Sequence, residues 1–214
     1  MDLKKKTLIT AFSLLTACSM KPLEPYVEPA SDVPTAKLRV ITNGYVRGNA
    51  YTGCSADTKV LAKAGRFFGE HQPSANYPQM PLVPKQLNMV ARFAPKMPEY
   101  LGATSMAEGA YTEMAPEYLV PTGKPFLLER LKLFAGSYGS TYQTCPEATR
   151  LFVFEENKSY EAYIGLVYRP TAEGNSQAIC AFSVYEVVPS GKSSRPLPNV
   201  LNFEPPADSN CGRH

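Results

Sequence analysis

The side chains best suited to chemistry in this chain are its five cysteines, because histidine occurs only twice. A thiol can act as a nucleophile, bind a metal, form a disulfide or carry a lipid. The first cysteine, Cys18, directly follows the small residues Thr16 and Ala17, behind three lysines at 4–6 and an apolar run at 8–15. That order is typical of a secretory signal. A run of eight residues is too short for a transmembrane helix, which needs about 20.

The tetrad Leu15-Thr16-Ala17-Cys18 resembles the lipobox of bacterial lipoproteins. The resemblance implies that residues 1–17 are a signal peptide and that Cys18 is the lipid attachment site, with diacylglycerol on its sulfur and an acyl chain on its amino group. Ser19 stands where an aspartate implies retention at the inner membrane, so the resemblance favours the outer membrane. We therefore expect a lipid-anchored protein of the bacterial cell envelope. The alternatives are an ordinary cleaved signal with a coincidental cysteine and a cytosolic N-terminal helix.

The other four cysteines are disulfide candidates, because an even number in an oxidising compartment predicts paired thiols. We favour Cys145 with Cys180, since both flank the same pair of expected strands, which leaves Cys54 for Cys211. Four cysteines allow three pairings, and the sequence does not choose among them. A metal site is disfavoured because no two cysteines have the short spacing of zinc ligands. No cofactor is expected.

No constellation of catalytic residues is recognisable. Ser137, in Gly136-Ser137-Tyr138-Gly139, lacks the spacing of a nucleophile elbow, and His71 is expected in an exposed loop. Glu155 and Glu156 are adjacent, so in a strand they would point to opposite faces. The sequence therefore favours a non-enzymatic protein.

Binding features are concentrated in two expected loops between residues 66 and 82. They hold the candidate partner-contact residues Arg66, Phe67, Phe68, Tyr77, Met80 and Leu82. Exposed apolar side chains in loops mark a contact surface. The alternative is that these groups cover one end of the fold. A second candidate is an aromatic platform for sugars or peptides, formed by Tyr160, Tyr163, Tyr168 and Tyr185, which could equally complete a core.

Charge excludes one class of partner. Removal of the signal takes three lysines and one aspartate from totals of 22 basic and 19 acidic side chains, leaving 19 and 18. Such a near-neutral chain has no electrostatic footprint for nucleic acid. The expected partners are the membrane, through the lipid, and envelope proteins.

Composition predicts a mainly β fold, since 20 prolines, 14 glycines and 13 tyrosines suit short strands and turns. We expect an acylated, proline-rich linker at 18–36, an antiparallel β-sandwich domain at 37–188, immunoglobulin-like or transthyretin-like, or a partly open barrel, and a tail at 189–214 strapped by Cys211. The expected strands lie at 38–41, 45–51, 85–93, 117–133 with a turn at 121–125, 150–155, 160–168 and 178–188. The alternation at 85–93 predicts a half-buried strand, and Asn43-Gly44 marks a turn. We expect 150–155 and 160–168 to form a hairpin joined by residues 156–159. Residues 58–68 are a short helix or an irregular strand, and 94–115 are unassigned.

This layout resembles that of uncharacterised proteobacterial lipoproteins with small β-sandwich domains. The resemblance implies a non-enzymatic binding or assembly module, for example an accessory subunit of an envelope or secretion complex. A carbohydrate- or peptidoglycan-binding lipoprotein is the alternative, and a hydrolase with an unrecognised site is the third.

Overall fold

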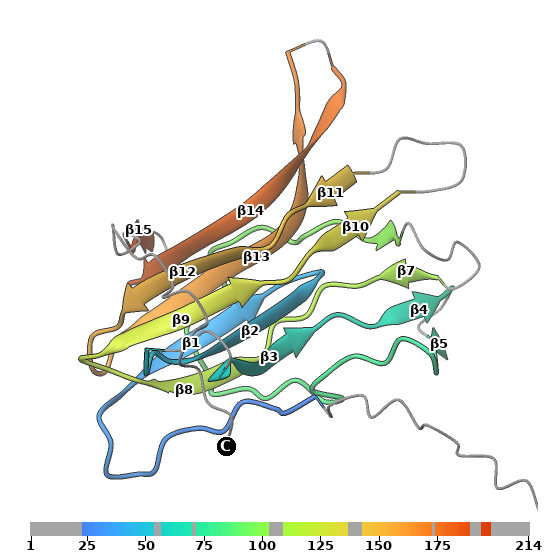
Figure 1. Cartoon of the computed structure of the whole chain (residues 1–214). Coiled ribbons are helices and arrows are strands. Elements are labelled where there is room, and N and C mark those ends of the chain that lie inside the picture. The colour runs from blue at the N-terminus through green and yellow to red at the C-terminus, as the bar shows by residue number, and fades with distance from the viewer. Residues whose placement is uncertain are drawn as a thin grey trace, which may run out of the picture.

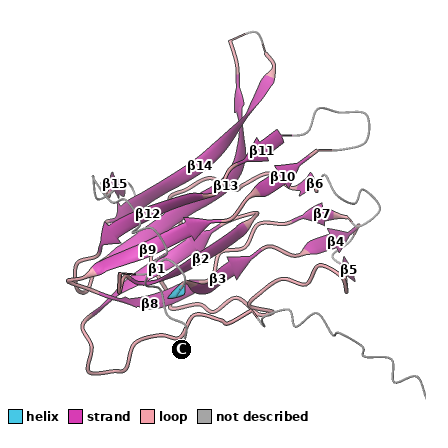
Figure 2. Ribbon diagram, in the orientation of Figure 1, coloured by secondary structure: helices cyan, strands magenta, loops and turns pink. Residues whose placement is uncertain are grey.

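The computed structural model describes residues 23–53, 57–69, 72–102, 109–136, 143–172, 174–188 and 194–197. Several sites considered above lie outside the described residues: the signal peptide, Cys18, Cys54, His71, Ser137 and Cys211. The described chain forms strands, turns and loops, with no α-helix and one short helical turn at Asp57 (Figure 2). The expectation of a mainly β fold is confirmed.

Two sheets pack face to face, and neither closes into a barrel (Figure 1). The first contains, in spatial order, β15 (Ser194–Pro196), β14 (Ser176–Val187), β13 (Ser159–Pro170), β1 (Thr35–Ile41) and β8 (Glu117–Pro121). The second contains β12 (Ala148–Val153), β9 (Pro125–Arg130), β2 (Tyr45–Ala50) and β3 (Lys59–Lys63). Pairing within both sheets is antiparallel, except that β1 and β13 run parallel.

Short strands extend one end of the sandwich, on the right of Figure 1. Four of them form a small sheet: β5 (Gln72–Pro73), β4 (Arg66–Phe68), β7 (Ala110–Tyr111) and β6 (Tyr100–Leu101). The other two, β10 (Leu133–Ala135) and β11 (Gln143–Cys145), pair with each other. Since β4 follows β3 and β10 follows β9 after two residues each, the four-stranded sheet of the sandwich continues directly into this end.

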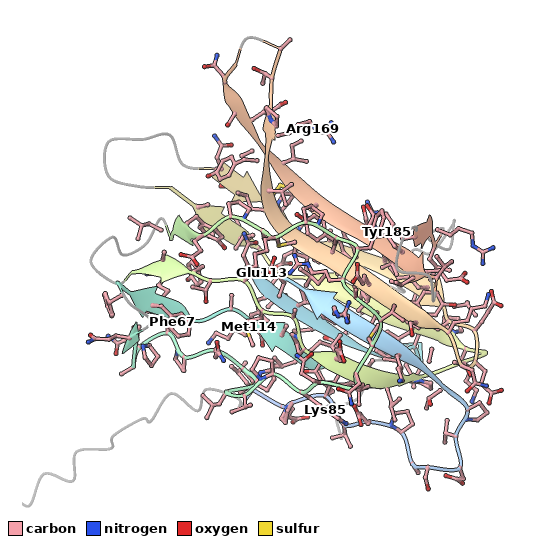
Figure 3. All side chains as sticks on the ribbon, turned by 180° about the vertical axis from the view of Figure 1, so that it is seen from behind. Phe67, Lys85, Glu113, Met114, Arg169 and Tyr185 are labelled. Carbon is pink, nitrogen blue, oxygen red and sulfur yellow. A yellow bond between two sulfur atoms is a disulfide. The ribbon has the colours of Figure 1, made fainter. Side chains whose placement is uncertain are left out.

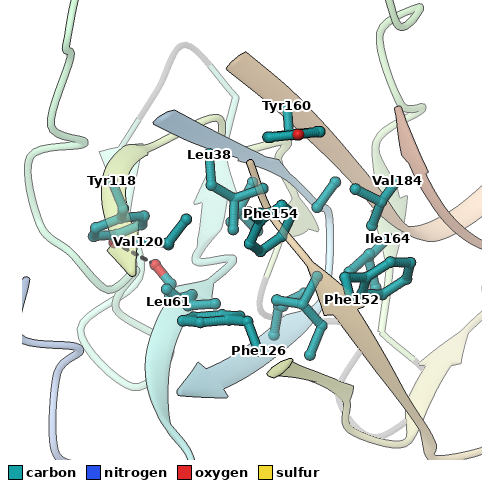
Figure 4. Close-up of a cluster of buried hydrophobic side chains, with 14 of the residues drawn as sticks. Leu38, Leu61, Tyr118, Val120, Phe126, Phe152, Phe154, Tyr160, Ile164 and Val184 are labelled. Carbon is teal, nitrogen blue, oxygen red and sulfur yellow. Dashed lines mark hydrogen bonds between the residues drawn. The ribbon is translucent and has the colours of Figure 1, made fainter. Parts of the chain in front are cut away.

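The core lies between the two sheets (Figure 4). Alternate residues of each strand point inward, as Leu38 and Val40 do in β1, so the two inner faces interdigitate. Rings dominate the centre, where Phe154 lies 4.8 Å from Tyr160 between centroids. Each large apolar side chain buried here contributes about 1.5–3 kcal/mol.

The expected hairpin between 150–155 and 160–168 is wrong. β12 pairs with β9 in one sheet, whereas β13 pairs with β1 and β14 in the other. The connection therefore crosses the sandwich, and both Phe152 and Tyr160 point into the same core. Strands are present in both predicted segments. The alternation of apolar and polar residues does not distinguish two strands paired as a hairpin from two strands that lie in facing sheets. The same holds for Asn43-Gly44, whose turn joins β1 to β2 in the facing sheet.

The long hairpin of this fold is β13–β14, with twelve register pairs from Ser159↔Val187 to Pro170↔Ser176. Only its first part, up to Tyr163, also pairs with β1. Ile164 and Leu166 are still buried, but the outer pairs, from Tyr168↔Ala178 to Pro170↔Ser176, project beyond the sandwich as a two-stranded ribbon, which we call the arm (Figure 1). The predicted disulfide between Cys145 and Cys180 is confirmed, with Cα atoms 5.4 Å apart, and it ties β11 to the arm near its base.

Residues 85–93 were expected to form a half-buried strand, and this is wrong. The segment runs over the outer face of the five-stranded sheet without a strand partner. Its backbone amides instead donate to carboxylates: Leu87 N lies 2.5 Å from Glu117 Oε2, and Phe93 N lies 3.1 Å from Glu161 Oε1. Carboxylate side chains of the sheet therefore accept the hydrogen bonds that the backbone of a neighbouring strand would otherwise accept.

The packed domain also begins earlier than expected. Tyr26, within the expected linker, is a core residue whose ring packs edge-on against Tyr118, with centroids 5.6 Å apart. Its amide donates to Val60 O at 2.9 Å. Described residues before β1 therefore cover the open edge of β3, which would otherwise offer unpaired backbone groups.

Candidate ligand-binding pocket

A pocket of about 170 Å³ lies at the end of the sandwich where β2 begins, β3 ends and β10 starts. Three basic side chains and three aromatic rings line it, together with smaller residues. The lining is Gly44, Tyr45, Lys63, Ala64, Arg66, Gly102, Tyr111, Lys132, Leu133 and Phe134. These residues come from five separate segments of the chain.

Arg66 is the central cation of the pocket, and it is only 1% exposed. Its guanidinium carbon lies 4.0 Å from the Tyr77 ring centroid and 4.4 Å from that of Tyr111. Its Nη2 also donates to the Tyr111 hydroxyl at 2.9 Å. Each desolvated contact between a guanidinium and a ring face contributes up to about 2 kcal/mol. The fold therefore keeps a fixed positive charge at the pocket wall.

Gly102 makes room for that charge. A Cβ atom at this position would lie 2.1 Å from Arg66 Nη2, closer than real atoms approach. Any other residue would have to displace the guanidinium. The absence of a side chain at Gly102 is thus part of what positions Arg66.

Two lysines add positive charge at the rim. Lys63 ends β3, and Lys132 lies just before β10, where its Nζ is 4.8 Å from the Phe134 ring centroid. Among the ion pairs between described residues, none involves Lys63 or Lys132. The described lining contains no aspartate or glutamate. The described lining is therefore a concave surface whose ionisable side chains are basic or tyrosine, an arrangement that concentrates anions.

Tyr45 supplies a neutral hydrogen-bonding group to the same lining. Burial raises the pKa of its hydroxyl above the ordinary value, with Arg47 lowering it and Glu129 raising it to lesser degrees. The hydroxyl therefore stays protonated near neutral pH and can donate to a ligand.

Asn43 holds the pocket wall formed by Gly44 and Tyr45. Its side-chain amide forms two hydrogen bonds with the backbone of Leu166, in the way that a neighbouring strand would. Nδ2 donates to Leu166 O at 2.8 Å, and Oδ1 accepts from Leu166 N at 3.0 Å. The carbonyl of Asn43 accepts from the Tyr100 hydroxyl at 2.6 Å. The turn between β1 and β2 is thereby fixed to β13, which is the rigidity a binding site requires.

The six predicted contact residues do not form one exposed loop surface. Arg66 is fully buried and Tyr77 packs against it, whereas Phe68 and Leu82 are exposed. Met80 forms reciprocal backbone hydrogen bonds with Lys63, of 2.8 and 2.9 Å. The structure thus brings Arg66 into the pocket with Tyr77 behind it, and it leaves Leu82 on another surface.

The predicted tyrosine platform is also divided. Tyr160 is fully buried in the core between the sheets. For this residue the alternative, that the tyrosines complete a core, is confirmed. Tyr163 packs with Ile41 on the opposite face of the sheet, and Tyr168 is exposed on the arm. Tyr185 lies against Phe93, with ring centroids 6.4 Å apart. These four rings do not share one surface.

Sequence reasoning missed most of the pocket, namely Tyr45, Lys63, Tyr111, Lys132 and Phe134. The only signal available was that both lysines come directly after apolar strands. That position is common for solvated lysines, so the pattern alone did not indicate a site.

Other chemistry is not visible in the described part of the chain. Within it, no three histidine, cysteine, aspartate or glutamate side chains are grouped so that they could hold a metal ion. No helix there is long and apolar enough to cross a bilayer. No protein-family model, curated protein or solved structure matches the sequence or the fold.

Proposed function

We propose that this protein is a lipid-anchored, non-enzymatic binding module of the bacterial cell envelope, and that its pocket takes a ligand with an anionic group. The lipobox-like tetrad ending at Cys18 supports the anchor and the location. The observation that carries the binding proposal is the convergence of Lys63, Arg66 and Lys132 on one pocket without a carboxylate in its described lining.

Ligand chemistry follows from the lining. Lysine and arginine form charge-assisted hydrogen bonds with carboxylate or phosphate oxygens. Tyr45, Tyr111 and Phe134 add apolar surface, which suits a ring or an aliphatic part of the same molecule. Cell-wall fragments that carry carboxylates combine both features. The lining therefore also supports the alternative proposal of a peptidoglycan-binding protein.

Binding is favoured over catalysis by the same residues. The described lining has no histidine, aspartate or glutamate, the groups that most often exchange protons near neutral pH. Its tyrosine at position 45 stays protonated for the reason given above. The pocket can hold and orient an anion, and it offers no recognised base.

Titration of the purified full chain tests the binding proposal, with inorganic phosphate, acetate and soluble cell-wall fragments as separate probes. Because the chain lacks tryptophan, its emission comes from its 13 tyrosines, and a ligand that contacts Tyr45 and Tyr111 should change that emission. Lys132→Met keeps the aliphatic stem and removes one charge, which should weaken binding roughly tenfold. Lys124→Met, at the exposed turn between β8 and β9, is the matched control and should bind normally.

Two results would contradict the proposal: no binding of any probe, or equal weakening by Lys132→Met and Lys124→Met. Added salt should also weaken binding, because exposed charges are screened.

Assembly through the arm is a second candidate function. A two-stranded ribbon is at best marginally stable alone in water, so a partner surface would stabilise its outer half. Tyr168 and Arg169 are exposed there, and Figure 3 shows Arg169 on the projecting ribbon. Cross-linking in living cells, compared between the native chain and Tyr168→Ala, tests this candidate. An envelope protein should be lost from the variant, and an unchanged set of cross-links would reject the arm as the contact.

A further inference from the structure

Four apolar side chains are exposed on two neighbouring segments along the β3 margin of the sandwich. Their exposed fractions are 42% for Leu23, 79% for Val27, 75% for Leu82 and 82% for Val83. Three of these values exceed that of every other large hydrophobic side chain in the described residues, the next being Phe93 at 46%. We call these four residues the apolar margin.

The two segments lie together because both cover the edge of β3. Val60 N donates to Glu24 O at 2.8 Å, and Lys63 N, three residues further along the same strand, donates to Met80 O at 2.8 Å. An ion pair between Glu28 and Lys85 joins the segments again beyond the strand. In Figure 1 both segments run along the lower margin of the sandwich, and Figure 3 shows Lys85 there from behind.

The short chain between Cys18 and Leu23 limits how far the apolar margin can lie from a lipid attached to Cys18. Only five peptide units separate Cys18 from Leu23, which span at most about 18 Å when fully extended. This limit holds for any conformation of those residues. If Cys18 carries acyl chains in a bilayer, Leu23 must lie within that distance of the lipid surface.

Two lysines at the margin already have acidic partners. Lys59 pairs with Glu24 and Lys85 pairs with Glu28, so these lysines give the surface no net charge. Attraction to anionic headgroups is therefore a minor contribution. Apolar burial has to supply the contact, as it does for amphipathic segments that lie about 5–10 Å deep in the interface.

We propose that the apolar margin rests on the bilayer, with Leu23, Val27, Leu82 and Val83 among the lipid headgroups and upper acyl chains. The proposal relies on the lipid anchor of the proposed function, and it does not depend on the pocket ligand. It assigns the domain one orientation at the membrane, with the β3 edge down and the β12 edge away, because these strands are the two edges of the four-stranded sheet.

The absence of tryptophan from the chain permits a direct test. Val83→Trp places a single tryptophan in the apolar margin, and Val153→Trp places one on β12, where the valine is 41% exposed. Each full-length chain is produced in bacteria, purified with its lipid and reconstituted into vesicles of phosphatidylethanolamine and phosphatidylglycerol. A matched set of vesicles contains phosphatidylcholine brominated on its acyl chains, which quenches tryptophan on contact.

Bromolipid should quench most of the emission of Val83→Trp and leave that of Val153→Trp unchanged. Quenching of Val83→Trp should also persist in high salt, because the contact is apolar. Vesicle flotation is measured on the same samples. A protein that floats but shows no quenching at position 83, or equal quenching at both positions, would overturn the proposal while the anchor stands.

The Cys18→Ser variant distinguishes a wrong orientation of the domain from the absence of a lipid anchor. Loss of flotation and of acyl labelling in Cys18→Ser supports the lipid anchor. If the native chain itself neither floats nor incorporates acyl label, the anchor fails, and the assigned orientation fails with it.

Discussion

Arg39 and Glu161 form an ion pair on the outer face of the five-stranded sheet, with Arg39 Nη1 2.6 Å from Glu161 Oε1. The same guanidinium donates to Glu117 at 2.7 Å through Nη2. All three side chains are buried beneath residues 87–94, whose amides donate to the two carboxylates. The cluster satisfies a buried arginine and, at the same time, holds a long irregular segment on the sheet.

Removal of the arginine should therefore destabilise the whole domain. Arg39→Met leaves two buried carboxylates facing each other without a cation, which should cost about 3–5 kcal/mol of unfolding free energy. Urea denaturation of the purified chain measures this loss. Glu155→Gln is the control, because its pair with Lys158 is exposed and should contribute little to stability. A loss of similar size in both variants would contradict a structural role for the Arg39 cluster.

Alkaline pH should unfold the domain through its buried tyrosines. Burial, reinforced by the negative charge of Glu28, raises the pKa values of Tyr26 and Tyr118 above their ordinary value. Below about pH 10 both residues are protonated in the folded and unfolded states, so their contribution to stability is fully present. Above it the unfolded chain releases protons that the folded chain retains, and stability falls as pH rises towards the folded-state pKa values.

Denaturation at a series of pH values measures this decline. Tyr118→Phe removes one ionisable group and should make the alkaline decline shallower. It should also cost about 1 kcal/mol at neutral pH, because the hydrogen bond to Leu61 O is lost. Identical slopes for both proteins would show that Tyr118 does not drive the alkaline unfolding.

The disulfide should stabilise the domain and hold the base of the arm. Loop-closure entropy for a sequence separation of 35 predicts a contribution of about 3–4 kcal/mol. Replacing both Cys145 and Cys180 by alanine should lower the unfolding free energy by this order. Limited proteolysis should also cleave first in the arm, between Tyr168 and Ala178, since the arm loses its covalent tie. Cleavage elsewhere at the same rate would argue against a local role for the disulfide.

Gly102 and Arg66 should be energetically coupled. Gly102→Ala forces a Cβ atom into the guanidinium, which should cost about 1–3 kcal/mol and weaken anion binding. In the background Arg66→Met the obstructing Nη2 is gone, so the same alanine should cost less. A double-mutant cycle for stability measures the coupling. Additive effects would mean that Gly102 is required for another reason.

Local patterns in the sequence identified many strands but not their partners. Residues 117–133 and 178–188 have the apolar alternation of strands, and both contain strands in the structure. The pattern at 85–93 is similar, yet that segment has no strand neighbour because Glu117 and Glu161 accept its amides. Nothing within the segment indicates that carboxylates distant in the sequence would take the place of a ladder.

The candidate site was even less predictable. Arg66 was expected on an exposed contact loop, but the rings of Tyr77 and Tyr111 enclose it from segments 11 and 45 residues away. Lys63 and Lys132 reach the same pocket from segments whose separation in sequence gives no hint of proximity.

The sequence by itself determined the mainly β character of the domain and favoured the Cys145–Cys180 pairing. The lipid anchor at Cys18 remains a prediction from the lipobox-like tetrad. Only the tertiary structure decided that β12 and β13 join different sheets, that Tyr26 belongs to the core and that three cations meet in one pocket. The physical reason is that side-chain alternation is a local property that specifies which face of a strand is buried, whereas strand pairing and pocket formation depend on contacts between segments far apart in the chain.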